Sequence, residues 1–317
     1  MSLLAMQTVM AAPAFTNAGF EDNGPAYNTG YNTFKTPVAG WSIIGSSGEA
    51  GVMYYTNDAF TSGTGYKSQI AGMRMGKGIS QTVSGFTPGQ NYRIKWEGNS
   101  RIAYGDGWLR ITAGGHIVWG DSCPMRSSFI NFTSYVFRAT GTNVTIQFQN
   151  PLSDDFTTLL DYLAIISTTN PVGPFVDVLP VAKGGTAIYT SSDAGYGVPP
   201  YDGYTQLRMQ FAGYYTMTIR EMRRRWKYTM SFYARNRGGS LNDYCVKIDG
   251  TNMFGGTNYT ATYTWENKQF EFTANSTTGM LTFQTFCTGG GDRTVFFDGF
   301  SVIPIGPENV GFCLMIR

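Results

Sequence analysis

Side chains that could act as an acid, a base or a nucleophile are sparse in this chain. The only histidine is His116, which falls in the turn of an expected hairpin, and no nucleophile motif lies near it. Asp154 and Asp155 are adjacent on a loop, where successive side chains point apart, whereas a glycosidase needs two carboxylates that face one cleft. These residues predict a protein that is not an enzyme.

Aromatic side chains are better candidates for a binding site. A sugar-binding surface combines flat rings, on which C–H faces stack, with polar groups that bond the hydroxyls. In the first half of the chain the candidates are Trp108, Trp119, Tyr104, Arg101 and Asp106. In the second half they are Tyr233, Tyr244 and Trp265. The simpler alternative is burial in a core, which is expected for Trp96 because it alternates with other large residues along a strand.

Basic residues gather in one short stretch of the second half. They are Arg220, Arg223, Arg224, Arg225 and Lys227. One interpretation is a solvated loop, and the other is a contact for an acidic protein neighbour, because arginine forks pair with carboxylates. Nucleic acid would need a larger basic face.

The composition indicates an all-β protein. Of the 317 residues, 15% are aromatic, only 14% are charged and 40 are glycine, a mixture that suits pleated strands joined by many turns. The net charge of +2 gives no general attraction to nucleic acid or to an anionic membrane. No apolar run is long enough to span a bilayer. The four cysteines have no CxxC spacing, so buried free thiols are expected.

Two stretches of similar pattern, residues 160–166 and 297–303, point to an internal repeat. Each places one aspartate, Asp161 or Asp298, after a bulky apolar residue and before an apolar strand. Further echoes follow in the same order, among them the expected strand at residues 73–75 with residues 207–209, and residues 92–96 with 228–232. We therefore expect two tandem antiparallel jelly-roll β-sandwiches with apolar N- and C-terminal arms.

The expected boundaries follow from this repeat. Residues 1–16 form an N-terminal arm rather than a signal peptide, and residues 17–168 form the first sandwich. Residues 169–174 are a linker rich in proline and glycine. Residues 175–304 form the second sandwich, and residues 305–317 form a C-terminal tail.

An ordered set of motifs in the first half resembles one family, the galactose-binding-like jelly rolls of the carbohydrate-binding-module type. The motifs are Asn-Ala-Gly-Phe-Glu at 17–21, Gly-Trp at 40–41, Gln-Thr-Val at 81–83, Thr-Pro-Gly-Gln-Asn-Tyr at 87–92 and Leu-Asp-Tyr-Leu-Ala-Ile at 160–165. The second half shows the same set more faintly. Such domains occur beside glycosidases, in surface proteins, and in phage head-decoration and tail proteins, so the resemblance implies a fold more than a function.

The resemblance also implies a structural calcium ion in the first domain. In many relatives the opening Glu and the closing Asp hold such an ion, and these positions correspond to Glu21 and Asp161. Carboxylates and carbonyls suit a hard cation. The alternative is that Glu21 caps a turn and Asp161 bonds to backbone amides. No metal is expected in the second copy, where Asp298 has no matching glutamate, and no other cofactor is required.

Two functions of different classes are compatible with these features. The first is a non-catalytic structural protein of a virion, a head-decoration or cement protein or a tail component. It would be a homo-oligomer that contacts capsid or tail proteins through its basic cluster and through Phe312, Leu314, Met315 and Ile316 of the apolar tail. The alternative is a secreted or cell-surface protein that binds carbohydrate. The two overlap, since a virion surface protein can also contact glycans, and neither requires nucleic acid or a membrane.

Overall fold

The structure is a computed structural model. It describes residues 11–23, 34, 36–46, 48–54, 69–101, 107–123, 128–153, 155–191, 198, 200–201, 205–238, 241–255, 258–286 and 293–308.

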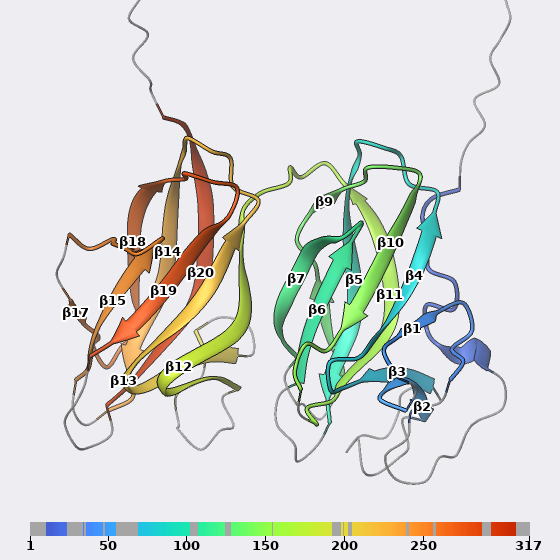
Figure 1. The fold of residues 1–317 in the computed structure, drawn as a ribbon, viewed down its shortest axis with the longest axis horizontal. Coiled ribbons are helices and arrows are strands. Elements are labelled where there is room, and N and C mark those ends of the chain that lie inside the picture. Colours follow the sequence, from blue (N-terminus) through green and yellow to red (C-terminus); the bar gives the residue numbers. More distant parts are fainter. Residues whose placement is uncertain are drawn as a thin grey trace, which may run out of the picture. The chain divides into compact units, whose positions relative to one another are not determined.

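The chain forms two compact units, Met1–Val172 and Gly173–Arg317. The boundary lies inside the stretch expected to be a linker. Apart from the short 3-10 turn η1 (Glu21–Asn23), the regular elements of the described residues are β-strands, and every strand pair is antiparallel. The expected all-β sandwich class is confirmed (Figure 1). Within the described ranges, no helix has the length and apolarity needed to cross a membrane.

The first unit contains two antiparallel sheets. Its strands are β1 (Ser42–Ile44), β2 (Ala50–Tyr54), β3 (Gln69–Met73), β4 (Gly78–Ser84), β5 (Asn91–Ser100), β6 (Gly107–Ala113), β7 (His116–Cys123), β8 (Ile130–Thr133), β9 (Phe137–Arg138), β10 (Asn143–Gln149) and β11 (Thr158–Thr168). One sheet has the order β1-β4-β10-β6-β7, and the other has the order β2-β3-β11-β5-β8, with β9 also paired to β5.

Alternation along the strands builds the core of the first unit. In β10 the residues Val144, Ile146 and Phe148 are buried while their neighbours in the strand are more exposed. Trp96 of β5 faces the same core, as expected, and its ring stacks on Phe132 with centroids 5.3 Å apart. A face of this kind stabilises a sheet only when a second layer covers it, which is why the two sheets pack together.

The second unit has a single curled sheet of nine strands. They are β12 (Phe175–Ser191), β13 (Thr205–Arg220), β14 (Trp226–Asn236), β15 (Asp243–Ile248), β16 (Thr251–Asn252), β17 (Tyr259–Thr260), β18 (Glu266–Thr273), β19 (Gly279–Thr285) and β20 (Thr294–Pro307). The main path is β16-β15-β19-β13-β20-β14-β18, with β12 beside β13 and β17 beside β15. Its core is aromatic, with Phe283 at 5.0 Å from Phe232 and 4.6 Å from Phe297 between ring centroids.

One long strand joins the two halves of that sheet. β13 pairs with β20 through residues 207–210 and with β19 through residues 213–219. Between these two segments Phe211 adopts a φ of 65°, and the pairing with β12 shifts register at the same place. β12 and β13 therefore run together through the unit (Figure 1), where the first unit uses four separate strands, β1 to β4.

The duplication is confirmed at the level of single residues. Tyr162 and Gly299 follow the two repeated aspartates, and both have a positive φ, 48° and 61°. Both donate their backbone N–H to the aspartate Oδ1, at 2.8 and 2.7 Å. The pairing with β5 and with β14 shifts register at this place in both units, so each aspartate marks the same β-bulge.

The expected strand at residues 73–75 is wrong in its extent. β3 ends at Met73, and Arg74 begins a turn in which Lys77 N–H donates to Arg74 O at 3.0 Å. Met75 has a φ of 52°, which a strand does not accommodate. The register also pairs residues 207–209 with 295–297, and this makes them equivalent to residues 71–73 rather than 73–75.

Part of the expected N-terminal arm belongs to the first unit. Phe15 is buried and stacks on Trp41 with ring centroids 5.4 Å apart, and Thr16 N–H donates to Gln81 Oε1 at 2.8 Å. Residues 1–10, and the tail residues 309–317 with Phe312, Leu314, Met315 and Ile316, lie outside the described residues. Cys123 and Cys245 are buried, and neither forms a disulfide.

Candidate functional site

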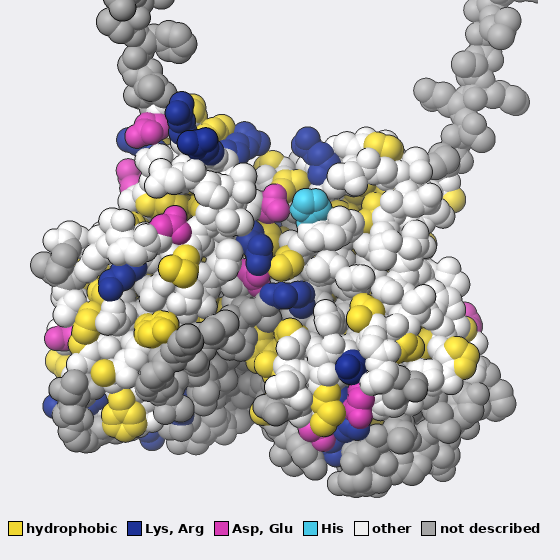
Figure 2. All heavy atoms as spheres, in the orientation of Figure 1, with side chains coloured by type: hydrophobic (Ala, Val, Ile, Leu, Met, Phe, Trp, Pro, Cys, Tyr) yellow, Lys and Arg dark blue, Asp and Glu magenta, His cyan; other side chains and the backbone are white. Residues whose placement is uncertain are grey.

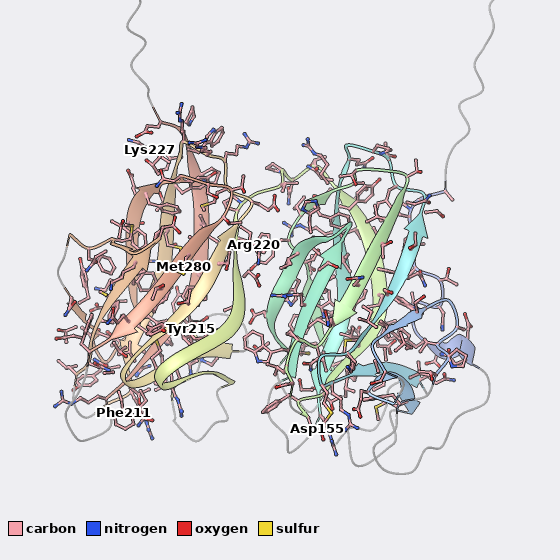
Figure 3. The ribbon with its side chains drawn as sticks, in the orientation of Figure 1. Asp155, Phe211, Tyr215, Arg220, Lys227 and Met280 are labelled. Carbon is pink, nitrogen blue, oxygen red and sulfur yellow. The ribbon has the colours of Figure 1, made fainter. Side chains whose placement is uncertain are left out.

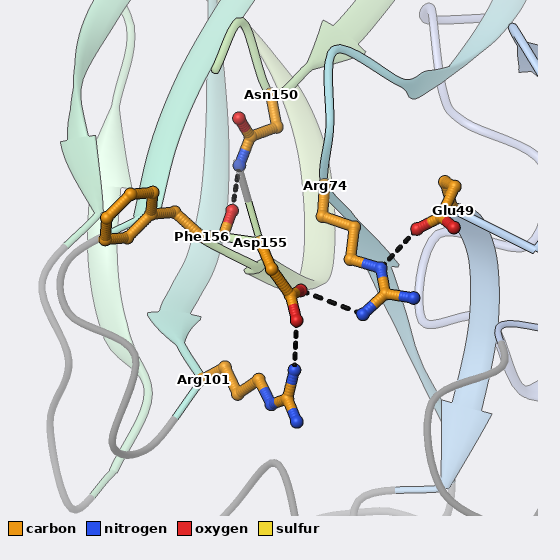
Figure 4. A network of polar contacts seen from close by, with 6 residues as sticks. All are labelled: Glu49, Arg74, Arg101, Asn150, Asp155 and Phe156. Carbon is orange, nitrogen blue, oxygen red and sulfur yellow. Dashed lines mark hydrogen bonds and ion pairs between the residues drawn. The ribbon is translucent and has the colours of Figure 1, made fainter. Parts of the chain in front are cut away.

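A buried ionic network holds Arg101 of the first unit (Figure 4). Its side chain is 0% exposed, and its Nη1 lies 2.8 Å from Asp155 Oδ2. The other oxygen of Asp155 lies 2.8 Å from Arg74 Nη1, and Arg74 Nε pairs with Glu49. Burial tends to lower the pKa of Arg74, but the hydrogen bonds to Glu49 and Asp155 outweigh it and raise that pKa. The arginine expected to contact a ligand instead pairs with a carboxylate of its own unit.

The two tryptophans expected to stack on a sugar are differently placed. Trp108 lies in β6 and is only 6% exposed, so its ring offers no face to a ligand. Trp119 of β7 is half-buried and packs edge-on against Trp96, with ring centroids 5.1 Å apart, and beside Tyr135 at 5.7 Å. Tyr104 and Asp106 lie outside the described residues. The described part of the first unit therefore does not bring the five candidates together.

The second unit has an outward-facing aromatic cluster, which we call the aromatic platform: Tyr201, Tyr233 and Trp265. The rings of Tyr201 and Tyr233 stack with centroids 3.4 Å apart and an angle of 16° between their planes. Trp265 stands at a steep angle to Tyr201, with centroids 6.1 Å apart. Tyr201 is 45% exposed, and Tyr233 and Trp265 are half-buried.

The strand pattern explains why these rings face outward. In β14 the residues Phe232 and Ala234 are buried, and Tyr233 alternates with them on the other face of the sheet. Register places Asn267 of β18 directly opposite Tyr233. Trp265 directly precedes Glu266, the first residue of β18, and therefore lies at the start of the same edge strand.

The repeated bulge fixes the position of Tyr201. Asp298 Oδ2 accepts a hydrogen bond from Tyr201 N–H at 2.8 Å. Next to it, a Cβ on Gly299 would lie 3.1 Å from Tyr233 Cδ2 and 3.3 Å from Tyr201 Cδ1. Glycine at this position, with its φ of 61°, therefore lets both rings approach the backbone.

Polar groups border the aromatic platform. The Cζ of Arg235 lies 5.9 Å from the Trp265 ring centroid, in cation–π range. Hydrogen bonds from Tyr201 and then from Asn267 lower the pKa of Tyr233. The site thus combines exposed ring faces with an arginine, an amide and two phenols.

The sequence pointed to part of this cluster. Tyr233 and Trp265 are two of the residues expected at a sugar-binding surface. The same expectation is wrong for Tyr244, because this residue lies fully in the core. Burial raises the pKa of the Tyr244 phenol accordingly. Tyr201 was missed. A tyrosine directly after two prolines in a loop was the available signal, because such a segment holds a ring at the surface.

The two expected calcium ligands lie on segments that the fold joins. Leu163 N–H donates to Ala18 O at 3.0 Å, which ties the turn at residues 17–23 to the bulge of β11. Asp161 is buried there, and a Cβ on Gly19 would lie 3.7 Å from its Oδ1. Glu21 Oε1 accepts a hydrogen bond from Gln69 N–H at 3.3 Å. Among the described residues no group of three or more His, Cys, Asp or Glu is arranged for a metal, so an ion here would need backbone carbonyls as additional ligands. Two carboxylates with carbonyls suit Ca²⁺ chemically.

The expected basic contact surface separates into two parts. Arg220 Nε lies 2.7 Å from Asp177 Oδ2, and Asp177 is buried, so this arginine is held within its own unit. The other cations, Arg223, Arg224, Arg225 and Lys227, are exposed. Lys227 lies at one end of the second unit and Phe211 at the opposite end (Figure 3). Lysine and arginine side chains crowd the first of these ends (Figure 2).

The residues considered for acid or base chemistry lie apart. His116 is exposed at the first position of β7, in the hairpin with β6. Both oxygens of Asp155 are engaged by arginines, and Asp154 lies outside the described residues.

Comparison with known proteins gives similarity in structure alone. No family model matches the sequence, and no curated protein matches it. Among solved structures, the CBM22-1–CBM22-2 tandem domain of Paenibacillus barcinonensis Xyn10C is 10% identical, with 94% of this chain and 99% of that chain covered and a TM-score of 0.35. A family 35 carbohydrate-binding module from Clostridium thermocellum is 18% identical, with 40% and 92% covered and a TM-score of 0.31.

A protein of another class is similar as well. A cyclase from Fischerella sp. TAU in complex with 4-(1H-indol-3-yl)butan-2-one is 18% identical, with 50% of this chain and 98% of that chain covered and a TM-score of 0.38. The similar structures thus include single and tandem carbohydrate-binding modules, the class of domain that the ordered motifs resemble. At these identities and TM-scores they do not assign a ligand or an activity.

Proposed function

We propose that this protein is a non-catalytic carbohydrate-binding protein whose ligand stacks on the aromatic platform of the second unit. The observation that supports the proposal is the exposed Tyr201, stacked on the half-buried Tyr233 beside Trp265. Pyranose rings present C–H faces to such surfaces. Arg235 and Asn267 stand where hydroxyl groups of a stacked sugar need directed partners.

A glycan array followed by calorimetry tests this proposal. The full chain is screened first, and the best glycan is titrated into the wild type and into Tyr201→Ala and Trp265→Ala. Each ring removed is expected to weaken binding at least about tenfold, which corresponds to about 1.4 kcal/mol. Tyr214→Ala is the matched control, because Tyr214 is also exposed but pairs with β19 in the other part of the sheet.

Two results would count against a platform of this kind. One is an array on which the full chain binds no glycan. The other is a glycan whose affinity is unchanged in Tyr201→Ala and Trp265→Ala.

The role as a structural protein of a virion remains a second proposal. Its main sequence argument is the pair of apolar terminal segments, of which residues 1–10 and 309–317 lie outside the described residues. What the described part offers is the exposed basic turn of the second unit. Such a role would be compatible with glycan binding, and light scattering of the full chain would test it through the expected homo-oligomer.

A further inference from the structure

The two units share one turn in full backbone detail. Residues 85–90 lead into β5, and residues 221–226 lead into β14, whose first residue is Trp226. Both turns make the same hydrogen bonds from backbone N–H groups to carbonyl oxygens. The bonds are Phe86 to Thr142 (3.1 Å), Gly89 to Ala139 (2.8 Å) and Gln90 to Thr87 (3.1 Å) in the first unit, and Met222 to Thr277 (3.0 Å), Arg225 to Ala274 (2.7 Å) and Trp226 to Arg223 (3.1 Å) in the second.

The residues at the two strained positions of this turn differ in kind. In the first unit the left-handed backbone positions are Gly85, with a φ of 91°, and Gly89, with a φ of 83°. In the second unit the equivalent positions are Glu221, with a φ of 58°, and Arg225, with a φ of 63°. A left-handed conformation costs free energy for any residue with a Cβ. The second unit thus carries charged side chains at two positions where glycine forms the same turn in the first unit. Strained positions of this kind gather at functional sites.

The side chains of the second turn form an exposed basic surface. The exposed residues are Arg223, Arg224, Arg225 and Lys227, with Glu221 as the acidic member. Arg223 Cζ lies 4.6 Å from the centroid of the half-buried Trp226 ring, which holds this guanidinium in place. Because the turn is closed by backbone hydrogen bonds, it does not need these side chains for its own structure.

Exposed apolar side chains lie next to the basic turn. Ile303 and Ile305 of β20 are 58% and 52% exposed. Register places Ile303 beside Thr229, and Gly306 beside Lys227, so both isoleucines lie beside the first residues of β14, where the chain leaves the turn. Glu308 N–H donates to Arg225 O at 2.7 Å and keeps the end of β20 against the turn.

We propose that this surface, residues 221–227 with Ile303 and Ile305, is a docking site for an acidic segment of a partner protein that also carries apolar side chains. Arginine forks pair with carboxylates in two-point contacts. Arginine and tryptophan are among the residues enriched at protein interfaces. The two isoleucines add apolar area, which a phosphate backbone would not cover. The site is separate from the aromatic platform and does not depend on glycan binding.

Fluorescence anisotropy with the full chain tests the proposal. The probe is a labelled synthetic peptide of alternating glutamate and leucine. The comparison probes are peptides of alternating glutamate and serine, and of alternating lysine and leucine, and a single-stranded DNA oligonucleotide. We expect the glutamate–leucine peptide to bind at least about tenfold more tightly than each comparison probe, and its affinity to fall with added salt.

Variants separate docking from folding. Arg225→Gly restores the residue of the sister turn, so it should raise the melting temperature of the second unit by about 2–4 °C while weakening peptide binding about tenfold. The double variant Ile303→Ser with Ile305→Ser should bind the glutamate–leucine peptide no more tightly than it binds the glutamate–serine peptide. Lys95→Ala removes one exposed positive charge from the first unit and should leave binding unchanged.

Three results would overturn the proposal. The first is a glutamate–leucine peptide that binds no better than the lysine–leucine peptide. The second is an oligonucleotide that binds more tightly, which would identify the turn as a nucleic-acid contact. The third is Arg225→Gly with a raised melting temperature and full peptide affinity.

Discussion

Asp161 and Asp298 occupy the same bulge in the two units, but their surroundings differ. Asp298 bonds two backbone N–H groups, those of Gly299 and Tyr201, and so positions a ring of the aromatic platform. Asp161 bonds Tyr162 N–H and faces the turn that carries Glu21. One repeated residue can therefore support a binding surface in one copy and a cation in the other.

Calcium binding by the first unit is the prediction that follows. We expect Ca²⁺ to raise the melting temperature of the first unit, because a ligand that binds only the folded state stabilises it, by about 2.7 kcal/mol at 100 times its Kd. Asp161→Asn should abolish the increase and Asp298→Asn should preserve it. Differential scanning calorimetry in calcium and in chelator measures this, and identical traces in both would contradict the prediction.

Asp155 should be the most sensitive charged residue in the first unit. Asp155→Asn removes the carboxylate that pairs with the fully buried Arg101 and with Arg74. Removing one partner from a buried ion pair typically costs 3–5 kcal/mol, and because Asp155 is partly exposed we expect about 3 kcal/mol. Urea unfolding followed by tryptophan fluorescence measures the loss.

The pair Lys268 and Glu266, whose side chains are 19% and 35% exposed, is the control for Asp155, whose partner Arg101 is fully buried. Its atoms are also 2.8 Å apart, but solvent screens such pairs, so Glu266→Gln should change the free energy of unfolding by less than about 1 kcal/mol. Equal losses in Glu266→Gln and Asp155→Asn would show that burial does not set the strength of the network.

At the scale of elements, a buried tyrosine braces the shared turn in both units. Tyr92 Oη accepts a hydrogen bond from Thr87 N–H at 3.0 Å, and Tyr228 Oη accepts one from Arg223 N–H at 2.6 Å. Tyr228→Phe leaves a backbone N–H without this acceptor and should lower the free energy of unfolding by about 1–2 kcal/mol. Chemical denaturation measures the change. Tyr214 is exposed, so Tyr214→Phe should leave the free energy of unfolding unchanged. An equal loss in Tyr214→Phe would contradict the stabilising role of the Tyr228 hydroxyl.

The strands themselves show what could be predicted from the sequence. Alternation and turn residues located most strands and the repeat, because each strand exposes one face and buries the other. The same pattern misplaced the end of β3, since Met73, Arg74 and Met75 alternate as a strand would, although the chain turns there. The long strand β12 was not expected, because its pairing partner β13 determines it and local pattern does not.

The candidate sites were less predictable for the same reason. Trp108 and Tyr244 look like surface aromatics in the sequence, but the layers that cover them come from distant segments. Arg101 was expected at a ligand, and its partner Asp155 lies far along the chain. Tyr201 gains its role only through Asp298 and Tyr233, which tertiary structure brings to it.

At the scale of the whole molecule, each unit has a core of its own and should fold on its own. We expect residues 1–172 and residues 173–317, expressed separately, to give folded β-rich proteins by circular dichroism. In the full chain Asp155→Asn should lower only the melting transition of the first unit, and Tyr228→Phe only that of the second. A single transition that both variants shift equally would show that the units unfold together.

The position of the chain ends within each unit has a mechanical consequence. In the second unit, β12 starts beside Arg220 and β20 ends beside Trp226, at either side of the same turn. In the first unit, Thr168 pairs with Asn91 and a Cβ on Gly85 would contact Ala11 O, so both ends again meet at the equivalent turn. A tensile force applied to the two ends of a unit would therefore break its inter-strand hydrogen bonds one after another. It would not have to break many of them at the same time, as shearing does. Units attached in this way should yield at low force, which optical tweezers can measure.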